Sequence, residues 1–149
     1  MKAFSFRLEP ILHLREGARK SALTIYAKSI RESQKLENEL FTLEQSLEDM
    51  KKVISAQRKR KFQPSSEIPH QASLSNLKDE INSKQKELQH SRHVENQKRD
   101  DFISSDNALK SVSRLKQKQQ TVHMSDQIRK EELELEDIIS SRYTFNLSS

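Results

Sequence analysis

The chain contains no cysteine and no tryptophan, and it has few residues that break helices: one glycine and three prolines among 149 residues. Without cysteine it has no disulfide framework, no cysteine-ligated zinc site and no thiol nucleophile. Only 32% of its residues are hydrophobic and 33% are charged, whereas ordinary globular domains are roughly 45–50% apolar. A compact domain built on a sheet needs turn glycines and a continuous apolar interior, so the composition excludes most such folds.

Long apolar runs are also missing. None approaches the roughly 18 residues of a transmembrane helix, and Arg7 and Glu9 interrupt the N-terminus before the apolar core of a signal peptide can form. We therefore expect a cytoplasmic chain without a transmembrane segment. The net charge of +5 is modest, so the distribution of charge says more about partners than its total.

Two of the three prolines mark the one place where the helical pattern is interrupted. Pro64 and Pro69 bracket the only stretch rich in proline and serine, and two prolines this close together disfavour one continuous helix. We predict an all-α fold, a long antiparallel two-helix coiled-coil hairpin whose second helix is longer and projects past the first. The predicted boundaries within a single domain, residues 1–149, are about 8–62 for helix 1, 63–72 for the hinge, about 73–143 for helix 2 and 144–149 for a frayed tail.

Apolar side chains recur with heptad spacing on both sides of the predicted hinge, as in a coiled-coil seam. The predicted seam consists of Leu36, Leu40, Leu43, Leu47, Met50, Ile54, Leu74, Leu77, Ile81, Leu88, Phe102, Leu109 and Val112. Folding about this hinge pairs residues whose numbers add to about 136, which puts Leu36 near Lys98 and Phe102. We expect a well-packed tip at the hinge. We expect a loose middle, because Arg92, Glu95 and Lys98 lie opposite Ser29 and Ser33 there.

The residues that carry enzyme chemistry are present but scattered. His90 and His93 lie one helical turn apart without a third metal ligand beside them, and the chain has no glycine-rich phosphate loop. Paired carboxylates are common, yet a two-helix coil offers no cleft that would desolvate them. We predict that the chain is not an enzyme and has no cofactor, no metal and no small-molecule substrate.

A basic run precedes the hinge, and no acidic residue occurs from Lys51 through Ser66. Its centre is Arg58, Lys59, Arg60 and Lys61. The run is typical of a surface that binds nucleic acid, acidic lipid or an acidic protein. It is also typical of a solvated helix end, where cations favour the negative pole of the dipole. Only Phe62 is close enough for base stacking, so a solvated helix end or a protein partner is favoured over nucleic acid.

The two ends of the chain carry the most informative motifs. The first helix opens with spaced aromatic and aliphatic residues and an arginine: Phe4, Phe6, Leu8, Leu12, Leu14 and Arg15. The second closes with an acidic stretch and an Arg-Tyr pair: Arg129, Glu131, Leu135, Glu136, Asp137, Arg142 and Tyr143. Hairpin geometry brings both motifs to the end opposite the hinge.

Together with the length and the hinge near the midpoint, these motifs resemble the FliJ family. This family is the small coiled-coil component of the bacterial flagellar type III export apparatus, and its members are similar to the coiled-coil stalk of the γ subunit of rotary ATP synthases. The resemblance implies a non-catalytic protein that binds the hexameric export ATPase as a central stalk and promotes its assembly and activity. It also implies coupling to the cytoplasmic part of the export gate, escort of substrate chaperones, and a cytoplasmic location peripherally associated with the inner membrane.

The resemblance assigns ATPase contacts to residues at the two chain ends. They are Phe4, Phe6, Leu8, Leu12, Arg15, Arg129, Glu131, Leu135, Glu136, Asp137, Arg142 and Tyr143. Two alternatives stay open at this point. One is the injectisome counterpart of the same stalk, and the other is a cytoplasmic adaptor that binds nucleic acid or acidic surfaces through Arg58, Lys59, Arg60 and Lys61.

Overall fold

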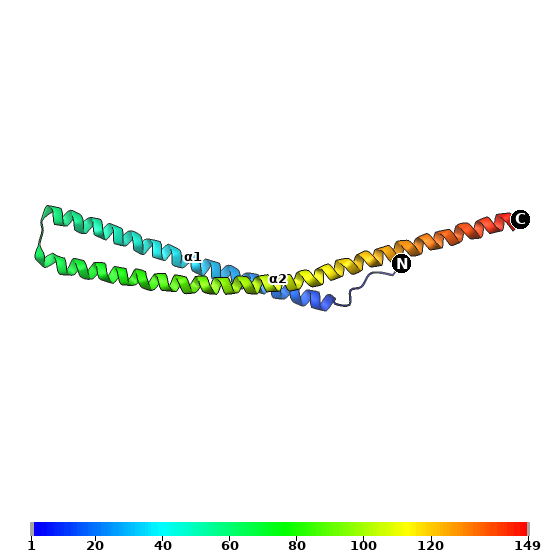
Figure 1. Cartoon of the computed structure of the whole chain (residues 1–149), viewed down its shortest axis with the longest axis horizontal. Helices are drawn as coiled ribbons and strands as arrows, with labels where there is room; N and C mark the ends of the chain where they lie inside the picture. Colours follow the sequence, from blue (N-terminus) through cyan, green and yellow to red (C-terminus); the bar gives the residue numbers. More distant parts are fainter. Residues whose placement is uncertain (1, 149) are drawn as a thin grey trace. The chain divides into compact units, whose positions relative to one another are not determined.

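The computed structural model describes residues 2–148 and contains two helices. Helix α1 spans Glu9–Arg60 and helix α2 spans Pro64–Ser148, with 52 and 85 residues respectively. They run antiparallel and pack against each other (Figure 1), and the described residues contain no strand. The predicted all-α hairpin with a longer second helix is therefore confirmed.

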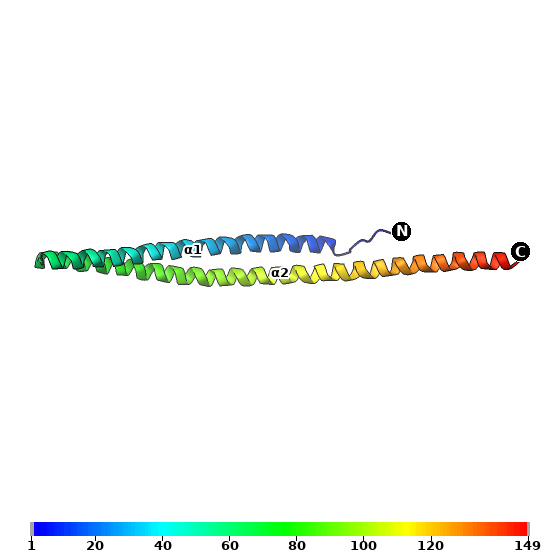
Figure 2. The same ribbon diagram turned by 90° about the horizontal axis from the view of Figure 1, so that it is seen from above.

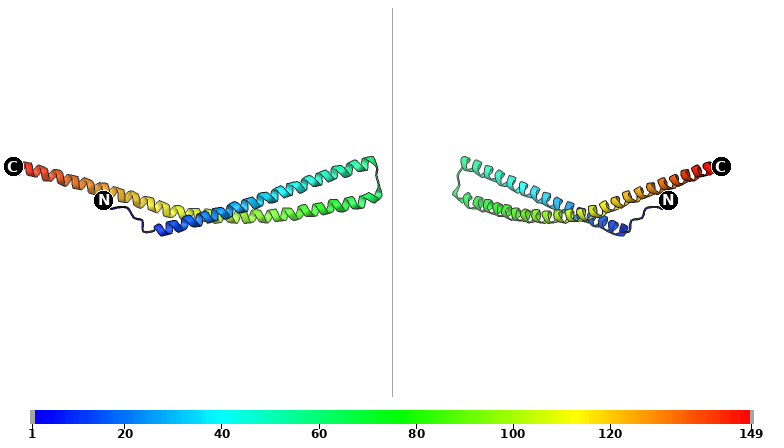
Figure 3. Two further views of the ribbon diagram at one scale, coloured as in Figure 1. Left: turned by 180° about the vertical axis from the view of Figure 1, so that it is seen from behind. Right: turned by 45° about the vertical axis from the view of Figure 1, so that its right-hand side comes forward.

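The connection between the helices is shorter than the sequence predicted. Between the two helices only residues 61–63 are non-helical, and Figure 3 shows this short connection, so the predicted hinge at 63–72 and the predicted start of helix 2 at 73 are wrong. Pro64 occupies the first position of α2, where proline leaves no helical bond unmade. The backbone N–H of Ser66 donates to the carbonyl of Gln63 at 3.0 Å and closes the first turn.

Pro69 lies inside α2, contrary to the expectation that two nearby prolines exclude a continuous helix. It has no N–H to bond the carbonyl four residues earlier, and its ring crowds the same carbonyl. In the second turn of a helix that carbonyl belongs to the exposed residue Ser65, where water satisfies it. The other boundaries also shift, because α1 ends at Arg60 and α2 continues to Ser148 through most of the predicted tail. Ser149 lies outside the described residues.

The shorter connection changes which residues of the two helices meet. Pairs such as Ser33 with Ser91 and Arg19 with Asp106 have numbers that add to about 125. Phe102 stacks on Tyr26, with 6.2 Å between ring centroids, instead of lying beside Leu36. The predicted register is wrong by roughly twelve residues, or about 18 Å along the helix axis, because the turn lies nearer the N-terminus than the sequence indicated.

The chain divides into two compact units. Unit 1 contains Met1–Arg19 and Ser104–Ser149, and unit 2 contains Lys20–Ile103. In unit 2 the two helices run alongside each other in both views (Figures 1 and 2). All the predicted seam residues of both units are buried or half-buried, with Ile54, Ile81, Leu88 and Val112 the most covered.

The middle of unit 2 contains buried residues that the prediction of a loose middle did not include, while towards the tip burial on α1 stops at Ile54, which is 5% exposed. Ser29 and Ser33 are buried, Ser33 with only 3% of its surface exposed. The Ser33 and Ser91 hydroxyls form a hydrogen bond of 2.9 Å. Small side chains let two helices approach closely, which explains the contact between Ser33 and Ser91. At the tip every residue from 55 to 65 is exposed.

A pair of cysteine substitutions tests this register. The chain has no cysteine, and the Ser33 and Ser91 Oγ atoms lie 2.9 Å apart, so Ser33→Cys with Ser91→Cys has the close approach that a disulfide needs. We expect oxidation to give an intramolecular disulfide, measured as the loss of both free thiols. As a control, Ser33→Cys with Ile103→Cys follows the register predicted from the sequence. It should stay reduced, because positions 91 and 103 lie roughly 18 Å apart along α2. The reverse result would contradict the register.

Candidate functional site

The N-terminal segment before α1 packs along α2 within unit 1. Phe6, Leu12 and Val112 form a buried hydrophobic cluster, and Phe4, Leu8 and Leu109 pack against it. Four of the residues to which the family resemblance assigned partner contacts are therefore covered by the chain itself: Phe4, Phe6, Leu8 and Leu12. Apolar side chains at this spacing hold the segment on α2, so we call residues 2–8 the N-terminal strap.

Polar contacts fasten the strap and the start of α1 to α2. The His123 ring stacks obliquely on Phe4, with centroids 5.6 Å apart, and its Nε2 lies 3.1 Å from the carbonyl of Lys2. Lys116 Nζ lies 2.9 Å from the Glu9 carboxylate. Arg15 donates from Nη1 to the carbonyl of Ala108 at 2.8 Å, so this predicted partner-binding residue also makes a contact within the chain.

Asp106 is the most strongly held carboxylate of unit 1. Lys110 and Arg19 approach its two oxygens at 2.7 Å each. Hydrogen bonds from these cations, Lys110 first, hold the pKa of Asp106 below its ordinary value of 3.8. Arg19 joins it to α1, whereas Lys110 lies four residues further along α2 itself.

The C-terminal part of α2 is uncovered. Every residue from 128 to 147 is exposed, whereas His123, which contacts the strap, is half-buried. All seven C-terminal residues of the predicted site lie on this exposed length: Arg129, Glu131, Leu135, Glu136, Asp137, Arg142 and Tyr143.

Several apolar side chains of this exposed length share one helix face. They follow the three- and four-residue steps of a coiled-coil seam, and they are between 51% and 66% exposed. We call this surface the C-terminal stripe, and it consists of Ile128, Leu135, Ile138, Ile139 and Tyr143. The predicted site omitted Ile128, Ile138 and Ile139, although their apolar spacing in the sequence was a signal that could have identified them. The stripe has the pattern of one half of a helix–helix seam, and no described part of the chain covers it.

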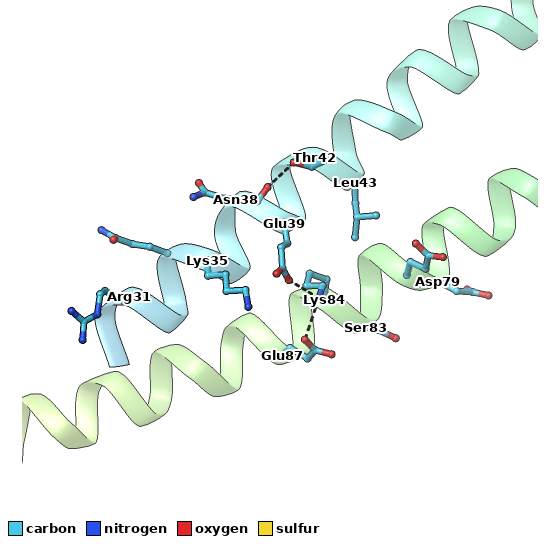
Figure 4. A pocket seen from close by; sticks show the side chains of 12 residues that line it. Arg31, Lys35, Asn38, Glu39, Thr42, Leu43, Asp79, Ser83, Lys84 and Glu87 are labelled. Atoms are coloured by element: carbon cyan, nitrogen blue, oxygen red, sulfur yellow. Dashed lines mark hydrogen bonds and ion pairs between the residues drawn. The ribbon is translucent and has the colours of Figure 1, made fainter. Parts of the chain in front are cut away.

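A groove of about 1060 Å³ lies between the two helices of unit 2. Its walls carry charges of both signs, and Figure 4 shows Glu39 of α1 and Glu87 of α2 both reaching Lys84, at 2.9 and 3.4 Å. The hydrogen bond from Lys84 lowers the pKa of Glu39, and the reciprocal bond raises the pKa of Lys84. Both groups therefore keep their ordinary charged states, and the Lys84–Glu39 ion pair joins the two helices across the groove.

The tip of unit 2 carries the predicted basic residues. Arg58 forms a bidentate pair with Glu67, at 2.8 Å from Nε and 2.6 Å from Nη2, which lowers the pKa of Glu67 and raises that of Arg58. Lys59, Arg60 and Lys61 are exposed. Three of the four predicted tip residues are thus left for an external contact.

Residues 2–148 contain no group of three or more His, Asp or Glu side chains placed to hold a metal ion. Within the same residues, no helix has both the length and the apolar character needed to cross a membrane.

Two matched leucine substitutions test which part of unit 1 is covered and which is exposed, through their effects on stability. Leu12→Ala removes a side chain from the buried cluster, so we expect the free energy of unfolding to fall by about 2–4 kcal/mol. Leu135→Ala removes the same atoms from an exposed position and should change it by about 0.5 kcal/mol or less. Urea unfolding followed by circular dichroism measures both. Equal losses would contradict the assignment of Leu135 to an uncovered surface.

The held carboxylate of Asp106 makes a pH-dependent contribution to stability. Because its pKa is lowered on folding, this contribution is present above the ordinary value of 3.8 and is lost as the pH falls through the folded pKa. Asp106→Asn should therefore reduce stability at neutral pH and flatten its decline below pH 3.8. Thermal melts of both proteins across this range measure the difference. An unchanged acid dependence in the variant would exclude this role for Asp106.

Comparison with known proteins agrees with this geometry. The family model described as "Flagellar FliJ protein" matches residues 4–147, nearly the whole chain. No curated protein and no solved structure matches the chain. The match covers most of the strap, both helices and the exposed end of α2. The chain therefore belongs to the FliJ family of flagellar proteins, whose members are components of the flagellar export apparatus.

Proposed function

We propose that this chain is a non-catalytic part of the flagellar export apparatus that binds the hexameric export ATPase as a central stalk and promotes its assembly and activity. The observation that carries the proposal is the C-terminal stripe, a half-seam left without a partner at the end of α2. Apolar side chains at seam spacing gain free energy only when another surface covers them. A protein partner of the export apparatus is the occupant that family membership supports.

The distribution of side chains around this segment favours a partner that surrounds the helix. Leu133 is also exposed, and it lies on a different face from the stripe. A flat partner would cover one face only, whereas the wall of a pore contacts several. The exposed segment has about 20 residues, or roughly 30 Å of helix, which is enough to enter such a pore.

The acidic side chains of the exposed end of α2 require a partner that carries positive charge. Acidic side chains lie between the stripe residues: Glu131, Glu132, Glu134, Glu136 and Asp137. Burying them costs free energy unless the partner supplies cations. We therefore expect basic groups on the part of the ATPase that receives the helix.

The N-terminal strap contributes to this function indirectly. Its apolar residues cover α2, so we propose that Phe4, Phe6, Leu8 and Leu12 hold the base of the exposed segment and do not bind the ATPase directly. A braced helix loses less conformational entropy on binding than a free one. Arg15 acts in the same way through its bond to Ala108.

The remaining parts of the proposal rest on family membership. They are coupling of the ATPase to the cytoplasmic part of the export gate, escort of substrate chaperones, and a cytoplasmic location peripherally associated with the inner membrane. The matched family is described as flagellar, which favours the flagellar system over its injectisome counterpart.

A double substitution in the stripe tests the ATPase contact. We expect Leu135→Ala with Ile138→Ala to weaken binding to the export ATPase of the same organism by at least about tenfold, since each truncation of a well-packed contact costs about 1 kcal/mol or more. Stimulation of ATP hydrolysis should fall in parallel. Biolayer interferometry and a phosphate-release assay measure the two effects.

The matched control is Leu14→Ala with Phe41→Ala, which truncates two exposed apolar side chains of α1 outside the stripe. This variant should bind normally. Unchanged affinity of the stripe variant, or equal loss in both variants, would refute the stalk contact.

A further inference from the structure

The tip of unit 2 combines exposed cations with exposed apolar side chains. We call Lys59, Arg60, Lys61, Phe62 and Ile68 the tip surface. Phe62, in the connection between the helices, is 61% exposed, and Ile68, in the second turn of α2, is 79% exposed. No acidic residue occurs from Lys51 through Ser66.

The acid nearest to the tip surface is already neutralised. Both oxygens of Glu67 accept hydrogen bonds from Arg58, at 2.8 and 2.6 Å. This pair cancels one positive and one negative charge, so Lys59, Arg60 and Lys61 remain as uncompensated cations beside Phe62. A cavity of about 300 Å³ at this place is lined in part by Arg60 and Lys61, and it offers room for one phosphate group.

Favourable interaction with the α1 dipole explains only part of this arrangement. Cations in the last turn of a helix stabilise its negative pole, which accounts for Lys59 and Arg60. It does not account for Phe62 and Ile68, whose apolar side chains remain in water. A single aromatic side chain is also too few for the base-stacking platform of a single-strand nucleic-acid site. Cations next to exposed aromatic and aliphatic groups are typical of surfaces that bind the membrane interface.

We propose that the tip surface binds anionic phospholipid bilayers. Phe62 and Ile68 enter the boundary between headgroups and acyl chains, and Lys59, Arg60 and Lys61 bind the lipid phosphates. This contact uses residues of unit 2 alone and does not depend on the proposed ATPase contact, which uses the end of α2 in unit 1.

The absence of tryptophan makes a direct test possible. Phe62→Trp introduces the only tryptophan of the chain, and Phe41→Trp provides a control of equal exposure, since Phe41 is 62% exposed on α1. Each full-length protein is mixed with vesicles of phosphatidylcholine alone or with added phosphatidylglycerol. We expect a blue shift and quenching by brominated lipid for position 62 with phosphatidylglycerol vesicles, and neither change for position 41.

Charge reversal tests the cations in the Phe62→Trp background. Lys59→Glu, Arg60→Glu and Lys61→Glu together should weaken vesicle binding at least tenfold. The matched control reverses three exposed lysines elsewhere in unit 2, Lys20→Glu, Lys28→Glu and Lys86→Glu, with the same change in net charge. This control should keep most of the binding, and circular dichroism verifies that both variants are folded.

Three results would overturn the proposal. The first is the absence of a spectral change at position 62 with anionic vesicles, and the second is an equal change at position 41. The third is tighter binding to single-stranded DNA or to an acidic polypeptide than to the vesicles, because the tip would then serve another class of partner. If the charge-reversal variant fails to fold, the comparison of neutral with anionic vesicles still decides the role of charge.

Discussion

The three-residue connection at 61–63 is the constraint on which the contacts between the two helices depend. Once the turn of an antiparallel hairpin is placed, the partner of every seam residue follows from the helical rise. In unit 1 this placement brings Glu9 to Lys116 and Arg19 to Asp106, and in unit 2 it brings Ser33 to Ser91. A turn centred a few residues later would separate all of these pairs. The ion pairs and the serine contact therefore act together with the turn to select one register.

Unit 1 contains a covered and an uncovered length of the same helix. The strap and α1 bury one face of α2 around Val112, and beyond them the C-terminal stripe remains exposed to water. The covered length holds the helix in place through hydrophobic burial, so the uncovered length can offer a preformed surface whose ordering cost has already been met during folding. The chain belongs to the FliJ family, whose members are components of the flagellar export apparatus, and this is the setting in which we propose that the stripe meets its partner.

Much of the fold could be predicted, and the reason lies in particular residues. One glycine, the spacing of Leu36 through Ile54 and the clustering of Pro64 and Pro69 indicated two long helices and a turn between them. The exact turn could not be predicted, because a proline near a helix start removes one hydrogen bond whose loss water offsets, whereas in a helix interior it would end the helix. That difference depends on the position of the helix start, which is itself a property of the folded chain.

By itself, the sequence determined the helical character, the antiparallel pairing and the motifs at the two chain ends, because these follow from local propensity and spacing. Only the tertiary structure decided what the end motifs do. Phe6 and Leu135 are both apolar residues of a terminal motif, yet Phe6 is buried against α2 and Leu135 is exposed. An apolar side chain that packs against its own chain and one that stays exposed to solvent have the same hydrophobic chemistry. The register of the two helices separates them, because it decides where the strap ends along α2.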